Sequence, residues 1–232
     1  MTDIRYSRLE LLNGIGGEGL TRIRQGKVIV IGCGALGSMC AMYLAASGVG
    51  TIAIADFDTI DISNLQRQLF FDEETLGKHK SAILAKRMRQ INSEINVIEI
   101  KNVINESLAR SLFPDYDFVI DGSDNPATKQ MTAKICEEMG KPYCIGGVKE
   151  YSGQAMSWKP GKTGYVDLFG EVKQCNDFMP CSFAGVLGPA AGITASTQAA
   201  EAIKYLTGKG EMLYDRLFSF DLFNCSANIF GF

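Results

Sequence analysis

The feature that most constrains the fold is a short apolar run that ends in a glycine-rich turn. Residues 27–32 read Lys-Val-Ile-Val-Ile-Gly, and β-branched runs of this kind are typical of buried parallel strands. The turn has the spacing Gly32-x-Gly34-x-x-Gly37, which allows a tight turn, a close approach of the backbone to a phosphate, and packing of a helix on the strand. A helical pattern follows over 35–48. We therefore expect the opening strand, turn and helix of a Rossmann-like, doubly wound sheet.

Strand and helix patterns alternate as far as residue 147. This alternation favours an α/β protein with a mainly parallel sheet, helices on both faces and right-handed crossovers. After residue 148 the pattern changes, and we expect additional antiparallel strands, a polar irregular stretch over 170–182 and a long Ala-rich helix. Residues 5–25 predict only short helical pieces. The predicted strands are 27–32, 51–56, 97–103, 117–121, 142–147, 153–158, 164–169 and 217–224, and the predicted helices are 35–48, 74–91, 107–113, 126–140 and 185–206.

Composition and length limit the class of protein. Residues 1–232 suit one α/β domain, the hydrophobic fraction of 46% suits a packed core, and no repeat, linker or low-complexity tract divides the chain. A net charge of −3 without basic runs argues against a nucleic-acid partner. No stretch is apolar enough to cross a bilayer and the N-terminus lacks a signal-peptide layout, so we expect a cytoplasmic protein with no membrane partner.

The cysteines and the histidine argue against a structural metal. Seven cysteines, an odd number, fit reduced thiols, and no pair has the C-x-x-C spacing of a four-thiolate zinc site. The chain has one histidine, His79, so a histidine-rich site is excluded as well. We expect no zinc.

Asp56 ends the second predicted strand. An acid at that place can accept hydrogen bonds from both ribose hydroxyls of a nucleotide. The backbone amides at the start of the preceding helix, at Ala35, would face an anion. A glycine turn without a ligand is one alternative, and NAD would use the same motif.

The polar segment that follows Asp56 in the sequence helps to decide between these alternatives. It reads Asn64-Leu65-Gln66-Arg67-Gln68, and Lys80 comes behind it. An ATP triphosphate carries about four negative charges, which Arg and Lys neutralise in ways that amides cannot, whereas a dinucleotide pyrophosphate needs few cationic side chains. We therefore favour ATP over NAD. The other interpretation of the segment is a solvated helix face, although its pattern lacks i,i+4 ion pairs.

A second polar segment follows the fourth predicted strand. Asp121-Gly122-Ser123-Asp124-Asn125 would lie at a strand's carboxyl end, beside the first strand, where ligands of doubly wound sheets bind. A carboxylate there could hold Mg²⁺ on the phosphates. The alternative role for Asp124 is to cap a helix with Pro126 at its second position, and one residue could do both.

Together these motifs resemble the E1-like adenylyltransferases, the ThiF/MoeB/HesA family that activates ubiquitin-like sulfur carriers in thiamin and molybdopterin biosynthesis. The resemblance covers nearly the whole chain. It implies that the C-terminal glycine carboxylate of a carrier similar to ThiS or MoaD attacks the α-phosphate of ATP, giving an acyl-adenylate and pyrophosphate. The matching motifs are Arg5-Tyr-Ser-Arg8, Gly32-Cys-Gly-Ala-Leu-Gly37, Asp56-Phe-Asp58, Ser63-Asn-Leu-Gln-Arg67, Gly77-x-x-Lys80, Ser123-Asp-Asn125 and Cys181-x-x-x-Gly185.

The resemblance also implies roles for single residues. Asp56 would hold the ribose, and Asp124 would coordinate Mg²⁺. Arg8 resembles the arginine that the family inserts from a partner subunit, which implies a homodimer, although a surface arginine is the alternative. Cys181 falls on a loop near the carrier's tail, where family members use a thiol covalently or dispense with it, so a catalytic and a structural role both stay open. The implied phosphate ligands are Asn64, Arg67 and Lys80 with Gln68 beside them, and the implied nucleotide-binding segments further include Gly32, Gly34, Ala35, Gly37, Ser63, Leu65, Gln66 and Asn125.

The chain departs from the family pattern in two respects. Many bacterial members carry two C-x-x-C pairs for zinc, and neither pair is present here. Ala35 stands where close relatives often have glycine. Three other functions stay open: an E1-like enzyme that adenylates a peptide or a modified tRNA base, a member that binds a partner without catalysis, and an NAD-binding oxidoreductase.

Overall fold

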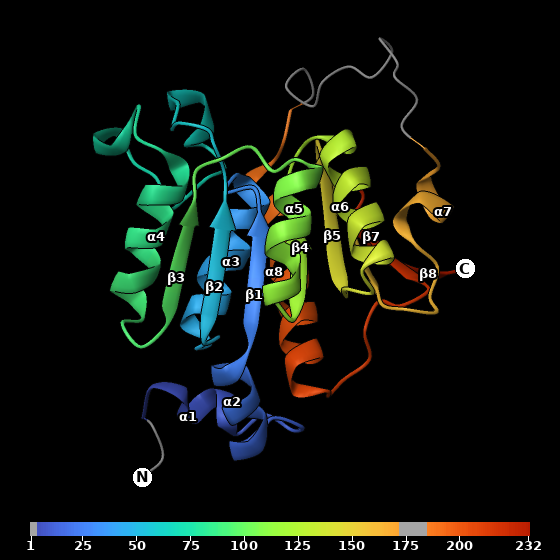
Figure 1. Cartoon of the computed structure of the whole chain (residues 1–232). Helices are drawn as coiled ribbons and strands as arrows, with labels where there is room; N and C mark the ends of the chain where they lie inside the picture. Colours follow the sequence, from blue (N-terminus) through green and yellow to red (C-terminus); the bar gives the residue numbers. More distant parts are fainter. Residues whose placement is uncertain (1–3, 172–184) are drawn as a thin grey trace.

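One eight-stranded sheet forms the centre of the molecule. The computed structural model describes residues 4–171 and 185–232. The strand order is β3-β2-β1-β4-β5-β6-β7-β8, in which β1 to β5 run parallel and β6 to β8 are antiparallel additions (Figure 1). This confirms the expected Rossmann-like, mainly parallel sheet. The strands are β1 Lys27–Ile31, β2 Thr51–Ala55, β3 Asn96–Ile100, β4 Phe118–Asp121, β5 Tyr143–Lys149, β6 Ser152–Trp158, β7 Arg216–Asp221 and β8 Ser226–Gly231.

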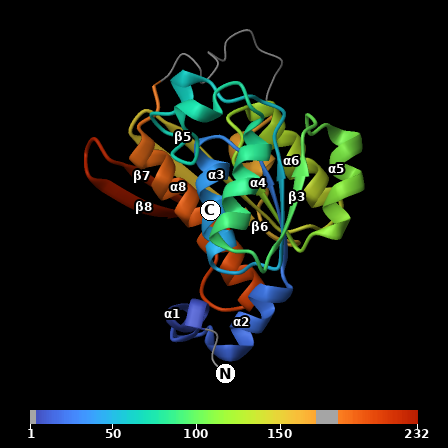
Figure 2. The same ribbon diagram turned by 90° about the vertical axis from the view of Figure 1, so that its left-hand side faces the viewer.

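Helices cover both faces of the parallel part. Side chains alternate along β1, so Val28 and Val30 enter one apolar cluster, whereas Ile29 and Ile31 enter another. The first cluster packs against α3, α4 and α8, and the second against α5 and α6, on the opposite side (Figure 2). The helices are α1 Ser7–Glu10, α2 Gly16–Gln25, α3 Ala35–Ala46, α4 Lys80–Ile91, α5 Glu106–Leu112, α6 Pro126–Glu138, α7 Tyr165–Phe169 and α8 Gly188–Thr207, with 3-10 turns at Ile4–Tyr6, Ile62–Asn64, Glu73–Thr75 and Phe113–Asp115.

The N-terminal residues form the short helical pieces that the sequence predicts. α1 and α2 lie at the end of the sheet opposite the carboxyl ends of the parallel strands (Figure 1). Tyr6 anchors this region because its ring is buried and its hydroxyl accepts a 2.7 Å hydrogen bond from the Asn92 side chain. The segment is thereby fixed at the far end of the molecule from the turn at Gly32.

The expected strand over 164–169 is wrong, because these residues form helix α7. Gly164 precedes the helix and donates its N–H to Asp167 Oδ2 at 3.0 Å, which caps the first turn. The rings of Tyr165 and Phe169, four residues apart, contact each other with centroids 4.8 Å apart. Gly170, with φ of +73°, ends the helix.

Two further elements differ from expectation. The helix expected over 74–91 begins only at Lys80, because Gly77 has φ of +75° and interrupts it. Strand β8 was not predicted. It is the exposed edge of the sheet, so its residues lack the alternation that marks a half-buried strand. Among the described residues, no helix is both long enough and apolar enough to span a membrane.

Candidate functional site

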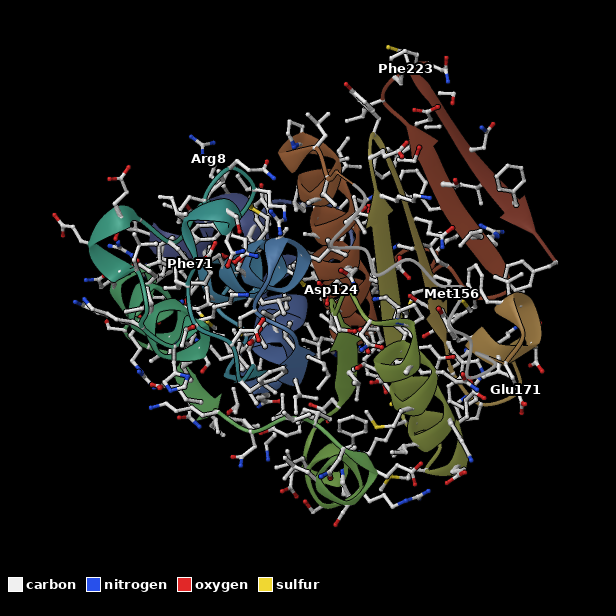
Figure 3. The ribbon with its side chains drawn as sticks, turned by 90° about the horizontal axis from the view of Figure 1, so that it is seen from above. Arg8, Phe71, Asp124, Met156, Glu171 and Phe223 are labelled. Carbon is white, nitrogen blue, oxygen red and sulfur yellow. The ribbon has the colours of Figure 1, made fainter. Side chains whose placement is uncertain are left out.

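A cavity of about 1020 Å³ opens at the carboxyl ends of the parallel strands. Ligands of open α/β sheets bind at this end, where the loops after β1 and β4 diverge. Figure 3 looks down on it, with Asp124 near the centre. The cavity brings together most of the predicted site residues: Gly32, Gly34, Ala35, Asp56, Ser63, Asn64, Gln66, Arg67, Gln68, Lys80, Asp124 and Asn125.

The glycine turn has the close packing that its spacing predicts. A Cβ atom on Gly37 would lie 1.8 Å from the carbonyl oxygen of Gly32, so α3 approaches β1 as closely as only glycine permits. Gly37 itself does not line the cavity and therefore acts by packing. Gly34 precedes α3 in an extended conformation and lines the cavity.

Asp56 joins two loops at the wall of the cavity. Its Oδ2 accepts a 2.6 Å hydrogen bond from the N–H of Cys33, and its Oδ1 accepts one of 2.7 Å from the N–H of Asp58. Burial raises the pKa of Asp56, while these two hydrogen bonds act in the opposite direction. The carboxylate thus holds the loops after β1 and β2 together and still borders the cavity.

The polar segment at 63–68 is a turn that folds over the cavity, so the solvated helix face is wrong. Arg67 donates to the carbonyl oxygen of Ser63 at 2.9 Å, which turns the guanidinium back along the chain. Gln68 is only 3% exposed, and its Oε1 has no hydrogen-bond partner in the described part of the chain. Leu65, which was expected among the nucleotide-binding residues, packs its side chain against the apolar core and does not line the cavity.

Lys80 is buried with a partner that the sequence reasoning overlooked. The side chain is 6% exposed, and its Nζ lies 3.0 Å from Asp58 Oδ2. The carbonyl oxygen of Asp58 also accepts a 3.0 Å hydrogen bond from the backbone N–H of Lys80, which fixes the start of α4. A lysine held in this way presents its charge to the cavity from a defined position.

In the segment after β4, neighbouring residues have different roles. Asn125, and not Asp124, caps α6: its Oδ1 accepts hydrogen bonds from the N–H groups of Ala127 at 2.8 Å and Thr128 at 3.3 Å. Asp124 is exposed and borders the cavity. The capping role considered for Asp124 therefore belongs to its neighbour, which leaves the Asp124 carboxylate available to a ligand.

The donor set around the cavity fits a nucleotide with Mg²⁺. Mg²⁺ is usually held by one or two carboxylates together with substrate phosphates and water, so Asp124 beside the glycine turn is a suitable single ligand. Within residues 4–171 and 185–232, no three metal-binding side chains gather, so a cage made by the protein alone is not formed there. The partnerless Oε1 of Gln68 could accept a hydrogen bond from a ligand hydroxyl or water.

Several cavity residues were missed by the sequence reasoning. Lys129 and Lys149 add two cations to the lining, and Gln154, Tyr165 and Phe169 continue it over β6 and α7. Lys129 was hidden in a helical pattern, and α7 was expected to be a strand. No local signal in the sequence marks these residues, because the packing of α6 and α7 and the turn between β5 and β6 bring them to the cavity.

Arg8 and Cys181 are the remaining predicted site residues. Arg8 is exposed on α1, at the opposite end of the sheet, and does not line it. Cys181 lies outside the described residues. The described cysteines are free thiols, and burial raises the pKa of Cys33 well above its usual range, with the Asp56 charge adding to the effect.

The fold and the cavity define an α/β protein of the Rossmann-like class. A model of the ThiF family matches residues 6–230, and the chain belongs to this family. The resemblance inferred from the motifs is therefore confirmed. The crystal structure of E. coli MccB has the same fold, with a TM-score of 0.87, 24% identity, and coverage of 99% of this chain and 70% of that one.

Two relatives carry the names of an adenylyltransferase and of an activating enzyme. The chain is 38% identical over 227 residues to the probable adenylyltransferase/sulfurtransferase MoeZ of Mycobacterium tuberculosis, covering 96% of this chain and 58% of MoeZ. It is 34% identical over 217 residues to the SAMP-activating enzyme E1 of Haloferax volcanii, covering 94% of this chain and 80% of that protein. The chain thus spans little more than half of the length of MoeZ.

Proposed function

We propose that this chain is an ATP-dependent adenylyltransferase that activates the C-terminal glycine of a ubiquitin-like sulfur carrier similar to ThiS or MoaD. The observation that carries the proposal is the single cavity that joins the glycine turn, Asp56, Arg67, Lys80 and Asp124 and then continues over β5 and β6. The names of MoeZ and the SAMP-activating enzyme support the same activity. We also propose that residues 1–232 form one adenylation domain and act in the cytoplasm, without a nucleic-acid or membrane partner.

The chemistry follows from charge and position. The carrier's carboxylate oxygen attacks the α-phosphorus of ATP, the bond to the bridging oxygen of the β-phosphate breaks, and pyrophosphate leaves with that electron pair. Arg67 and Lys80 would neutralise phosphate charge, and Asp56 would hold the ribose hydroxyls. Bound Mg²⁺, held by Asp124, would screen the negative charge of the phosphates. No strong base is needed, because the nucleophile is already ionised at neutral pH.

The second half of the cavity would take the carrier's tail. It is lined by the glycines of β5, Gly146 and Gly147, and by Gln154 and the rings of Tyr165 and Phe169. A Cβ atom on Gly146 would meet the buried Gln198 side chain at 2.6 Å, so this glycine serves the packing of α8. Gly147, which lacks such a close neighbour, leaves room for a narrow main chain beside the strand, so an extended glycine-rich tail fits this half of the cavity. Cys181 keeps both of its possible roles, covalent or structural.

The test is ATP–pyrophosphate exchange by the full chain with a ThiS-like or MoaD-like protein that ends in Gly-Gly. We expect exchange that depends on the carrier, because acyl-adenylate formation is reversible. The matched control is the same carrier without its last glycine, which should support no exchange. Normal ATP binding without exchange for any such carrier would refute the proposed substrate class.

A further inference from the structure

Lys129 on α6 is a buried charge that the mechanism above does not use. It is 7% exposed, and its Nζ lies 3.2 Å from Asp121 Oδ1 and 2.6 Å from the carbonyl oxygen of Gly146. The first partner ends β4 and the second lies in β5, so one ammonium group bridges two neighbouring strands and α6. A buried charge is costly unless it is paired, and this pairing places it at the wall of the cavity.

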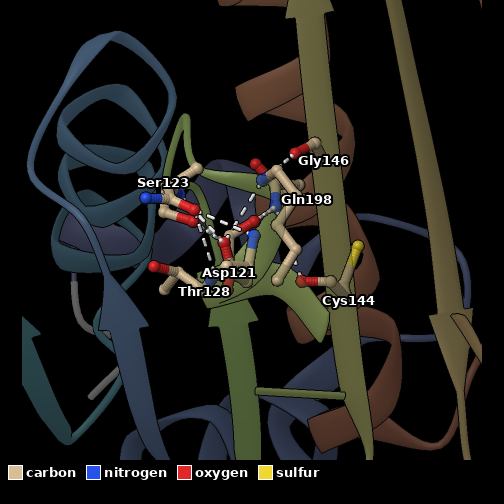
Figure 4. A network of polar contacts seen from close by, with 9 residues as sticks. Asp121, Ser123, Thr128, Cys144, Gly146 and Gln198 are labelled. Atoms are coloured by element: carbon tan, nitrogen blue, oxygen red, sulfur yellow. Dashed lines mark hydrogen bonds and ion pairs between the residues drawn. The ribbon is translucent and has the colours of Figure 1, made fainter. Parts of the chain in front are cut away.

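Asp121 transmits this contact to the adjoining loop. The side chain is fully buried, and its Oδ1 also accepts hydrogen bonds from the N–H of Ser123 at 2.9 Å and from the Ser123 hydroxyl at 2.6 Å. Gln198 on α8 donates to the Asp121 carbonyl oxygen at 2.8 Å. Figure 4 shows this network. Within the described chain Oδ2 has no hydrogen-bond partner, so the single oxygen Oδ1 carries the contacts to both Lys129 and Ser123.

The contacts close a ring around Asp124. Ser123, on one side, is held by Asp121, and Asn125, on the other side, is held by the first turn of α6. Lys129 lies in that same part of α6 and returns to Asp121. Asp124 and Asn125 are both exposed, but Asn125 is fixed by the helix cap, so Asp124 is held in place by its neighbours on both sides. Preorganised carboxylates of this kind owe their position to such supporting contacts.

We propose that Lys129 is a positioning residue that sets the place of the Asp124 carboxylate, and with it the affinity for Mg²⁺ on bound ATP. The inference rests on the proposed function, since it assumes ATP with Mg²⁺ in this cavity. Lys129 acts through Asp121 and Ser123 and touches no reacting atom in this role. A lysine that served the fold alone would affect nucleotide binding equally with and without the metal.

The experiment measures ATP binding by calorimetry, in EDTA and in saturating MgCl₂, for the full wild-type chain and for Lys129→Met. We expect the gain in affinity on adding Mg²⁺ to fall about 10- to 100-fold, as is typical when a supporting contact of a metal ligand is lost. Binding in EDTA should stay near the wild-type value. Lys134→Met is the matched control, because Lys134 is exposed on the same helix and should change neither value.

A second variant covers the case in which Lys129→Met does not fold. The double variant Asp121→Asn/Lys129→Met removes both buried charges together, which is far better tolerated than removing one. It should show the same selective loss. Wild-type Mg²⁺ dependence in a folded variant, or an equal loss with and without Mg²⁺, would overturn the role of Lys129. A wild-type chain that binds no ATP would instead refute the proposed function, and the inference with it.

Discussion

Within residues 4–171 and 185–232, Asp124 has no hydrogen-bond or ion-pair partner, unlike the carboxylates near it. Asp56 accepts two backbone hydrogen bonds, Asp58 pairs with Lys80, and Asp121 is buried against Lys129. Within the described part of the chain no donor contacts the Asp124 side chain, while its neighbour Asn125 carries the helix cap. A carboxylate left exposed among satisfied ones is the group best placed to meet a ligand.

At the scale of single residues, we predict that Asp124→Ala abolishes ATP–pyrophosphate exchange and leaves the fold intact. The side chain is exposed, so its loss leaves no buried cavity. Exchange should fall by at least about 100-fold, the usual effect of removing one electrostatic contact in a preorganised site. Thermal unfolding checks the fold, and Asp115→Ala, which removes an exposed acid from a 3-10 turn before β4, is the matched control. Near-normal exchange in Asp124→Ala would show that Asp124 does not hold the metal.

Among the elements, α7 defines the second half of the cavity, and it is held in place by a few polar contacts. Tyr143 in β5 donates its hydroxyl to Glu137 Oε1 at 2.7 Å and accepts the N–H of Tyr165 at 2.9 Å. Its ring stacks on Trp158 at a centroid distance of 5.5 Å. One tyrosine thus connects β5, α6 and the first residue of α7, whose ring lines the cavity.

We predict that Tyr143→Phe loosens α7 without disturbing the nucleotide half. The change keeps the stacked ring, and the N–H of Tyr165 then keeps only its longer hydrogen bond of 3.3 Å to Glu137 Oε1. This loss should cost about 0.5–1.5 kcal/mol in the free energy of unfolding. The KM for the carrier should rise while the Kd for ATP stays constant. Denaturant unfolding and exchange kinetics at varied carrier concentration measure the two effects. A change in ATP affinity alone would contradict this division of the cavity.

At the scale of the whole molecule, the position of Arg8 determines how this residue could take part in the reaction. α1 lies at the far end of the sheet from the cavity, so Arg8 cannot reach the cavity of its own chain without rearrangement of the buried Tyr6 anchor. The homodimer that the family resemblance implies would solve this by supplying Arg8 from a second copy. Closed two-fold dimers are the commonest oligomers, and each copy would then complete the site of the other.

We predict that two inactive variants restore activity when mixed. Arg8→Ala and Asp124→Ala should each fail in exchange assays alone. After the two are unfolded and refolded together, mixed dimers have one site with both changes and one site with neither. Random pairing should therefore restore about a quarter of wild-type activity. Analytical ultracentrifugation checks that the dimer forms, and no recovery in a verified mixed dimer would refute action in trans.

The central architecture could be predicted from sequence because local physics determines it. Runs such as 27–32 and 51–56 are apolar enough to require burial on both faces, and the spacing of Gly32, Gly34 and Gly37 suits only a tight strand–turn–helix connection. The acid at Asp56 and the exposed Asp124 follow strand ends, and the ends of parallel strands meet at one edge. The nucleotide half of the cavity was therefore accessible from the order of motifs alone.

What the tertiary structure alone decided is which charges pair and which face the cavity. Lys80 with Asp58, and Lys129 with Asp121, meet only because parallel strands bring distant loops together, and no spacing in the chain announces such a pair. Helix α7 was likewise misjudged because its capping by Asp167 and its contact with Tyr143 outweigh a strand-like local pattern. The sequence specified which segments had to be buried and where the chain had to turn. Long-range packing selected the partner of each buried charge, because the energy of a buried charge depends on neighbours from elsewhere in the chain.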